Sequence, residues 1–159
     1  MKKSLLRDAI IAQLRAELSR QTVAANLARD EAISEESQPE NKYDTHSQEA
    51  AYLAEGQARL VAEIEASLAQ YAALPLPDFG PDAVIALGAL VELGAHGAST
   101  WYFLGPRAGG LELSVDGRNV LLVTPQSPLG RELLGRRKDD IVRAPGPGGP
   151  VEHRVLSVA

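Results

Sequence analysis

Glycine and proline are distributed very unevenly along the chain. Residues 1–80 contain 2 glycines and 3 prolines, whereas residues 81–159 contain 12 glycines and 7 prolines. Because both residue types break regular helices, the first half can form long helices and the second half requires frequent turns. Charge changes at the same place, from 8 basic and 13 acidic side chains to 8 of each. We therefore predict two domains, 1–74 and 81–159, joined by a stiff linker at 75–80.

The first domain is predicted to be an antiparallel helical hairpin. Neither Gly nor Pro occurs between Leu5 and Arg29, and a second helix is expected from about Thr45, which fits a capping box with Gln48, to Ala73. Each helix would be about 40 Å long at 1.5 Å per residue. An apolar stripe on each helix would be buried only against the other helix, as in a coiled coil. The expected stripes are Ile11, Leu14, Leu18, Ala25 and Ala28 on the first helix and Leu53, Leu60, Ile64, Leu68 and Tyr71 on the second.

The second domain is predicted to be a small antiparallel sheet with one short helix, so the fold class is α+β. Asp116-Gly117 is a typical hairpin turn. Ser127 can cap the short helix, Pro128 suits its first turn, and Gly135 can end it. Short runs rich in Val, Leu and Ile between glycines predict strands at 83–93, 100–104, 110–115, 119–123, 140–143 and 151–158.

Composition excludes several classes of protein. The chain has no cysteine, which excludes disulfides, thiolate catalysis and cysteine-bound zinc. A net charge of −5 argues against a general nucleic-acid binder. No apolar run approaches the roughly 18 residues that a membrane span needs. We expect a soluble cytoplasmic protein that does not contact a membrane.

The expected hairpin end is the most acidic part of the chain. Carboxylate oxygens are suitable ligands for Mg²⁺, which usually takes one or two of them together with other ligands. Such a segment could complete a metal site only together with a partner. A solvated acidic loop, with its charges complementing the dipole of the second helix, is the simpler interpretation. The segment contains Lys42 and the acids Asp30, Glu31, Glu35, Glu36, Glu40 and Asp44.

Other conspicuous segments have plainer interpretations. The glycine- and proline-rich residues 146–150 lack the Lys-Ser or Lys-Thr pair of a phosphate-binding loop and are expected to connect two strands. The basic run 136–138 is followed at once by two aspartates and is expected to be a solvated turn. Trp101, Tyr102 and Phe103 lie in one predicted strand, where neighbours point to opposite faces. None of the histidines has metal-ligand spacing.

Three segments resemble the bacterial Gre family of transcript-cleavage and elongation factors. Residues 124–129 read Thr-Pro-Gln-Ser-Pro-Leu and are followed by Leu133-Leu134-Gly135, which is similar to the family's T-P-x-S-P-L-x-x-x-L-L-G segment. Residues 64–68, Ile-Glu-Ala-Ser-Leu, are similar to part of the family's coiled-coil helix, and Glu40-Asn41 with Tyr43 to its acidic tip. The resemblance covers nearly the whole chain.

The resemblance implies a function at RNA polymerase. The C-terminal FKBP-like domain would dock at the rim of the polymerase secondary channel, with Ser127, Pro128 and Leu129 in the docking surface. The hairpin would enter the channel, and Glu36, Glu40 and Asp44 would help to hold a catalytic Mg²⁺ shared with the polymerase. The polymerase would then cleave backtracked RNA, so the protein would stimulate an enzyme without being one. A monomer is implied, with indirect contact to nascent RNA and the DNA template.

The tip departs from the family pattern, which leaves the function open. The family's catalytic pair is an Asp and a Glu three residues apart, whereas Glu36, Glu40 and Asp44 are spaced by four. Such spacing shares a helical face, but Pro39 opposes a helix there. A regulator that occupies the channel without stimulating cleavage is therefore the alternative. An FKBP-like prolyl isomerase or chaperone ranks lower, because such a pocket needs several aromatic residues, and a self-associating coiled-coil adaptor also stays open.

Overall fold

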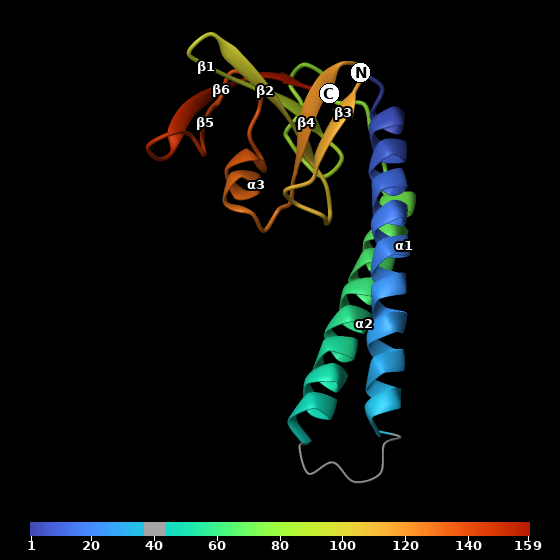
Figure 1. The fold of residues 1–159 in the computed structure, drawn as a ribbon. Helices are drawn as coiled ribbons and strands as arrows, with labels where there is room; N and C mark the ends of the chain where they lie inside the picture. Colours follow the sequence, from blue (N-terminus) through green and yellow to red (C-terminus); the bar gives the residue numbers. More distant parts are fainter. Residues whose placement is uncertain (37–43) are drawn as a thin grey trace. The chain divides into compact units, whose positions relative to one another are not determined.

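The computed structural model describes residues 1–36 and 44–159, with side chains for 1–34 and 48–159 (Figure 1). The chain forms two compact units. We call Ile11–Ala69 the hairpin unit, and Met1–Ile10 together with Gln70–Ala159 the sheet unit. A long helical hairpin and a sheet with one short helix confirm the predicted α+β class. The ends of the helices belong to the sheet unit, so the compact units are not simple consecutive ranges of sequence.

Two long helices make up the hairpin. Helix α1 spans Lys3–Glu36 and α2 spans Asp44–Ala73. Helix α1 continues seven residues beyond the predicted end at Arg29, since residues 30–36 contain neither Gly nor Pro. Helix α2 ends just before Leu74, whose position ahead of Pro75 disfavours helical backbone. Because α2 begins at Asp44, Thr45 lies in the first turn instead of preceding the helix. The prediction that Thr45 caps α2 is therefore wrong.

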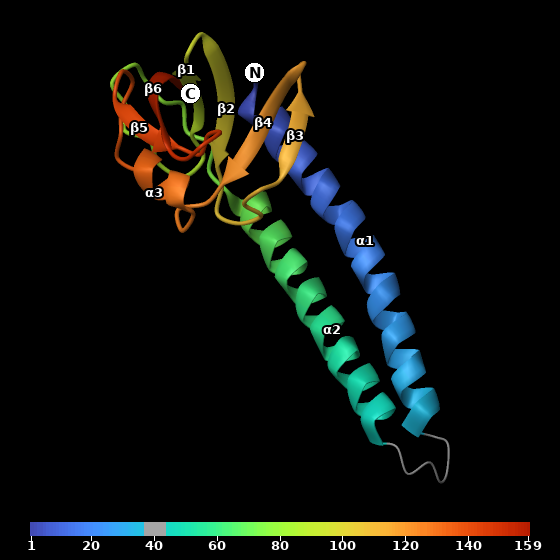
Figure 2. The same ribbon diagram turned by 60° about the vertical axis from the view of Figure 1, so that its left-hand side comes forward.

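The hairpin seam follows a strict seven-residue repeat, and both views show the two helices side by side (Figure 2). Leu53 and Leu60, which were predicted for the seam of α2, are 54% and 44% exposed, so this prediction is wrong. Ala54 and Gln57 take the inward positions at this level, because the seven-residue spacing that runs through Val61 and Leu68 turns the neighbouring leucines outward. The buried and half-buried seam positions are Ile11, Leu14, Leu18, Gln21, Ala25, Ala28 and Ala32 on α1, and Ala50, Ala54, Gln57, Val61, Ile64 and Leu68 on α2.

The sheet unit contains six strands in the order β3-β4-β2-β1-β6-β5. Strand β4 runs parallel to β2, so the sheet is mixed and the prediction of a purely antiparallel sheet is wrong. The chain reverses direction between β2 and β3 and again between β3 and β4. Strand β4 therefore runs in the same direction as β2, beside which it lies. The elements are β1 (Leu90–Ala95), β2 (Ala98–Leu104), β3 (Glu112–Val115), β4 (Arg118–Val123), helix α3 (Pro128–Leu133), β5 (Ile141–Ala144) and β6 (Val151–Val158).

Local turn chemistry behaves largely as predicted. Asp116 and Gly117 both have positive φ, at 51° and 71°, as a type I′ turn between β3 and β4 requires. The predicted strand at 83–93 is confirmed only from Leu90 onward. Before it, Gly88 has a φ of 84°, and the Ile85 amide donates a 2.8 Å hydrogen bond to the Arg136 carbonyl. This stretch therefore pairs with the loop after α3 instead of extending β1.

Both faces of the sheet are covered, which explains the alternation in the aromatic strand. Tyr102 packs in a core with Leu129 and Leu133 of α3. Phe103 faces the other way and is fully buried, beside Leu90 of β1 and Leu122 of β4 in the ladder. The side chains of the same unit that are buried outside the first core come from this second face and from the helix ends. They are Leu90, Phe103, Leu113, Val120 and Leu122 with Leu6, Ile10, Tyr71 and Leu74.

Polar contacts fix the helix ends to the sheet unit. The buried Tyr71 hydroxyl donates a 2.6 Å hydrogen bond to the Arg107 carbonyl and lies against Gly105, where a Cβ would lie 2.1 Å from the hydroxyl oxygen. Lys3 donates to the Pro77 carbonyl, and its ammonium lies 4.6 Å from the centre of the Phe79 ring. Partial burial lowers the pKa of Lys3.

No helix in the described part of the chain is long and apolar enough to cross a membrane.

Candidate functional site

Two of the three predicted metal-facing acids lie at the outer ends of the two long helices. Glu36 is the last residue of α1, and Asp44 is the first residue of α2. Glu40 lies outside the described residues. Glu36 and Asp44 therefore belong to two different helices, and their spacing of eight residues does not place them on one helical face. The hairpin brings the two positions to the same end of the unit.

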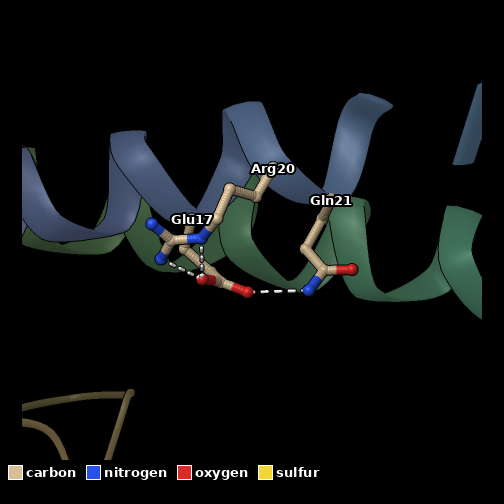
Figure 3. A network of polar contacts seen from close by, with 3 residues as sticks. All are labelled: Glu17, Arg20 and Gln21. Atoms are coloured by element: carbon tan, nitrogen blue, oxygen red, sulfur yellow. Dashed lines mark hydrogen bonds and ion pairs between the residues drawn. The ribbon is translucent and has the colours of Figure 1, made fainter. Parts of the chain in front are cut away.

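Some of the charged side chains along the hairpin are paired within their own helix. Glu17 accepts hydrogen bonds from Arg20, with Nε at 3.0 Å, and from the Gln21 amide nitrogen at 2.7 Å (Figure 3). The bond from Gln21, followed by those from Arg20, lowers the pKa of the Glu17 carboxyl. On α2, Arg59 forms an exposed ion pair with Glu55 at 3.2 Å. Such exposed pairs contribute little to stability and leave Glu17 and Glu55 engaged within their own helices.

The predicted docking residues begin α3, whose start is well defined. The Ser127 hydroxyl oxygen accepts a 3.0 Å hydrogen bond from the Gly130 amide, and its proton is donated to the Thr124 carbonyl at 2.8 Å. Pro128 occupies the first turn, and Gly135 has a φ of 77° after the helix, so the predicted cap and stop are confirmed. Gly130 is required there, because a Cβ would lie 1.8 Å from the Thr124 carbonyl oxygen.

A cavity of about 440 Å³ lies between α3 and the β5–β6 connection. Leu129 is only 5% exposed, so this side chain belongs to the core and also lines the cavity, while Pro128 is exposed. The lining is mostly apolar, with one acid and one base, and includes no aromatic side chain of the kind expected in a prolyl-isomerase pocket. It consists of Pro128, Leu129, Glu132, Arg143, Ala144, Pro145, Gly146, Gly149 and Pro150.

The sequence did not point to this cavity. Its two walls are 11 or more residues apart in sequence, and only the pairing of β5 with β6 brings residues 143–150 beside α3. Gly146 permits the close turn, because a Cβ there would lie 2.5 Å from Val151 Cγ2. The prolines on both sides of the predicted loop were the available signal, since rigid apolar residues at an exposed turn favour a binding surface.

The remaining candidates behave as ordinary surface features. The Asp140 carboxylate accepts from the Arg137 amide at 2.8 Å, and Asp139 lies 3.9 Å from Arg154, so the acids after the basic run are engaged locally. The ring of Trp101 is covered by the Arg118 guanidinium at 4.9 Å. Among the described residues, no group of three or more His, Asp or Glu side chains is arranged to hold a metal ion.

Comparisons with known proteins give likenesses only among solved structures. No protein-family model and no curated protein matches the chain. Among solved structures, the chain is similar to Gfh1 of Thermus thermophilus, a GreA factor homolog, with 21% identity, 94% of each chain covered and a TM-score of 0.39. It is also similar to Gfh1 of Thermus aquaticus, with 23% identity, 92% of each chain covered and a TM-score of 0.41. A GreA/GreB elongation factor from Nitrosomonas europaea is 20% identical over 60% of this chain and 78% of that chain, with a TM-score of 0.38.

Proposed function

We propose that this protein is a Gre-like transcription elongation factor that binds bacterial RNA polymerase. The observation that carries the proposal is the position of the acidic segment. In the hairpin unit, α1 from Ile11 and α2 up to Ala69 each contribute 26 residues, which corresponds to about 39 Å of helix. The acids at the end of these helices are therefore remote from the base of the hairpin. A rod of this kind suits delivery of carboxylates through a narrow passage, such as the polymerase secondary channel.

The chemistry proposed for the tip is metal binding shared with the polymerase. Glu36, Glu40 and Asp44 offer hard oxygen donors, which suit Mg²⁺, and an ion that takes one or two carboxylates from this chain would take its other ligands from the polymerase. A second Mg²⁺ in a two-metal site activates water and stabilises the leaving oxygen in phosphodiester hydrolysis. In this proposal the protein is not itself an enzyme. Its carboxylates position the ion, and the polymerase cleaves the backtracked RNA.

Docking is proposed for the α3 side of the sheet unit. The exposed ring of Pro128 and the cavity beside it offer an apolar depression with Glu132 and Arg143 at its edge. An apolar side chain of the polymerase would fill the depression, while the two charges would select the polar groups around it. Ser127 acts through the helix cap, which fixes the direction of α3 and with it the position of Pro128.

A cleavage assay on stalled, backtracked bacterial polymerase tests the role of the tip. The variant Glu36→Ala/Glu40→Ala/Asp44→Ala should lose stimulated RNA cleavage by about 10–100-fold, the usual effect of removing a group that orients a metal ion. Binding to the polymerase should be unchanged. The matched control is Glu63→Ala/Glu65→Ala/Glu112→Ala, which removes three exposed acids elsewhere and should retain cleavage. Full cleavage by the tip variant would remove these acids from the mechanism.

A matched pair of proline variants tests the docking surface. Pro150→Arg places a long charged side chain on the cavity wall, whereas Pro147→Arg makes the same change at an exposed position of the same connection outside the lining. Polymerase affinity, measured with immobilised polymerase, should fall at least about tenfold for the first variant and stay unchanged for the second. Equal affinities for both variants would exclude the cavity from docking.

A non-catalytic regulator of the same polymerase channel is the second candidate. It is favoured by the separation of Glu36 and Asp44 onto two helices, which differs from a closely spaced pair of acids on one segment. Unaltered cleavage in the presence of saturating protein, together with tight polymerase binding, would identify this function. Absence of polymerase binding would overturn both candidates.

A further inference from the structure

The seam of the hairpin changes character along its length. Near the sheet unit it contains large apolar residues, and farther out, as far as the described side chains extend, it contains only alanine. We call Ile11–Arg20 with residues 58–69 the proximal half, and Thr22–Ser34 with Gln48–Gly56 the distal half. The proximal seam positions are Ile11, Leu14, Leu18, Val61, Ile64 and Leu68, and the distal ones are Ala25, Ala28, Ala32, Ala50 and Ala54.

Large apolar residues of the distal half are turned away from the seam. Five occur there, and every one is more than half exposed, whereas Leu14 in the proximal half is 7% exposed. The distal helices therefore gain little from burial against each other, because an alanine methyl buries far less apolar area than a leucine side chain. The five residues are Val23 at 58%, Leu27 at 65%, Ile33 at 51%, Tyr52 at 73% and Leu53 at 54%.

Two glutamines mark the boundary between the halves. Gln21 lies fifteen residues before the end of α1, and Gln57 lies thirteen residues after the start of α2, so they occupy nearly the same level of an antiparallel pair. Both are half-buried seam positions. Together they form a polar layer, Gln21 and Gln57, between the leucine-rich and alanine-rich parts of the hairpin.

The polar layer is incompletely satisfied. Gln21 directs its amide nitrogen along its own helix to Glu17, at 2.7 Å. The Gln57 side-chain oxygen is buried and has no hydrogen-bond partner among the described residues. A buried acceptor without a donor destabilises the packed arrangement relative to an opened one, in which water can donate to it. This defect lies at the level where the seam loses its large side chains.

We propose that the polar layer divides the hairpin into two cooperative units, so that the distal half opens while the proximal half stays folded. Cooperative opening spreads only as far as packing couples neighbouring residues, and coupling across this layer is weak. The inference concerns the free chain and holds whatever partner the tip meets. Its consequence is that the end of the hairpin can change conformation without releasing its base.

Native-state hydrogen exchange on the full chain tests the division directly. Backbone amides at residues 25–33 and 50–56 should exchange about 100-fold faster, or more, than those at 14–19 and 61–68, reflecting alanine in place of leucine at the seam. Denaturant should accelerate exchange of the proximal amides more steeply than that of the distal amides, because opening the whole hairpin exposes more surface than opening its distal half. Similar rates and the same denaturant dependence in both halves would overturn the proposal.

A pair of double variants tests the role of the layer itself. Gln21→Leu/Gln57→Leu replaces it with apolar side chains and should slow distal exchange by about tenfold or more. The control Gln13→Leu/Gln70→Leu makes the same substitutions at exposed positions of the same two helices and should leave distal exchange unchanged. An equal slowing in both variants, or in neither, would show that the glutamines do not form the boundary. Gln57→Leu alone, which removes the amide that carries the unpaired oxygen and leaves Gln21 in place, should give part of the effect.

Discussion

The sheet unit and the hairpin unit use their apolar residues in opposite ways. In the sheet unit both faces are covered, and side chains such as Phe103, Leu104 and Leu133 are fully buried. In the hairpin unit the seam is narrow, and the large apolar residues of its distal half are exposed. The difference shows that the sheet unit is specified by packing, whereas the hairpin unit depends on helix propensity and a few contacts. Substitutions should therefore have very unequal effects in the two units.

The largest effect is expected for Phe103→Ala in the sheet unit. This side chain is 0% exposed and lies in the second core, so its removal should lower the free energy of unfolding by about 3–5 kcal/mol. Trp101, the only tryptophan, reports unfolding of this unit by fluorescence in denaturant. Val84→Ala in the same unit, at a side chain 45% exposed, is the control. This variant should change the free energy of unfolding by less than about 0.5 kcal/mol. Similar effects of both would contradict the two-sided core.

A smaller, local loss is expected for Leu14→Ala in the hairpin seam. Leu14 is 7% exposed, so the variant should destabilise the hairpin unit by about 2–3 kcal/mol. Faster amide exchange in the proximal half, with an unchanged Trp101 transition, would show that the two units respond separately. A shift of both signals together would mean that they unfold as one.

Tyr71→Phe should cost about 1 kcal/mol, because the hydrogen bond from its hydroxyl to the Arg107 carbonyl is lost. Burial raises the pKa of Tyr71 well above its ordinary value of 10.0. The folded state therefore keeps this proton while the unfolded state loses it, so stability is present below about pH 10 and declines above it. Urea unfolding at about pH 9 and about pH 11 should show a smaller decline for the variant. Burial also raises the pKa of Tyr102, so part of the decline in stability with rising pH should remain in the Tyr71→Phe variant.

The smallest effect is expected for Leu27→Ala in the distal half. Its side chain is 65% exposed, so the free energy of unfolding should change by less than about 0.5 kcal/mol. Thermal unfolding followed by helical circular dichroism would measure this. A loss as large as that of Leu14→Ala would show that Leu27 is buried in solution, and it would end the contrast between the halves.

Several elements could be predicted because their signals are local. The α2 range, the Asp116-Gly117 turn and the capped helix α3 depend on residues within a few positions of one another. Turn and cap chemistry acts over that range. The residues of the proposed docking surface, Ser127, Pro128 and Leu129, were named because they belong to one continuous motif that resembles a known family.

Other features required contacts between distant parts of the chain. Leucine at positions 53 and 60 looked like the seam of α2, yet the partner helix selected alanine and glutamine at positions 54 and 57. The parallel pairing of β4 with β2 likewise depends on which of the two strands β3 and β4 lies next to β2. The cavity beside α3 exists only once β5 and β6 have paired.

The sequence by itself determined the division into helix-forming and turn-rich halves, the acids of residues 30–44 and the motif around Ser127. These follow from composition and short-range backbone chemistry, which do not depend on the fold. Only the tertiary structure decided the mixed sheet, the cavity wall at Arg143–Pro150 and the unpaired oxygen of Gln57. Each of these depends on which surfaces meet, and a linear sequence pattern fixes which side chains could be buried but not against what.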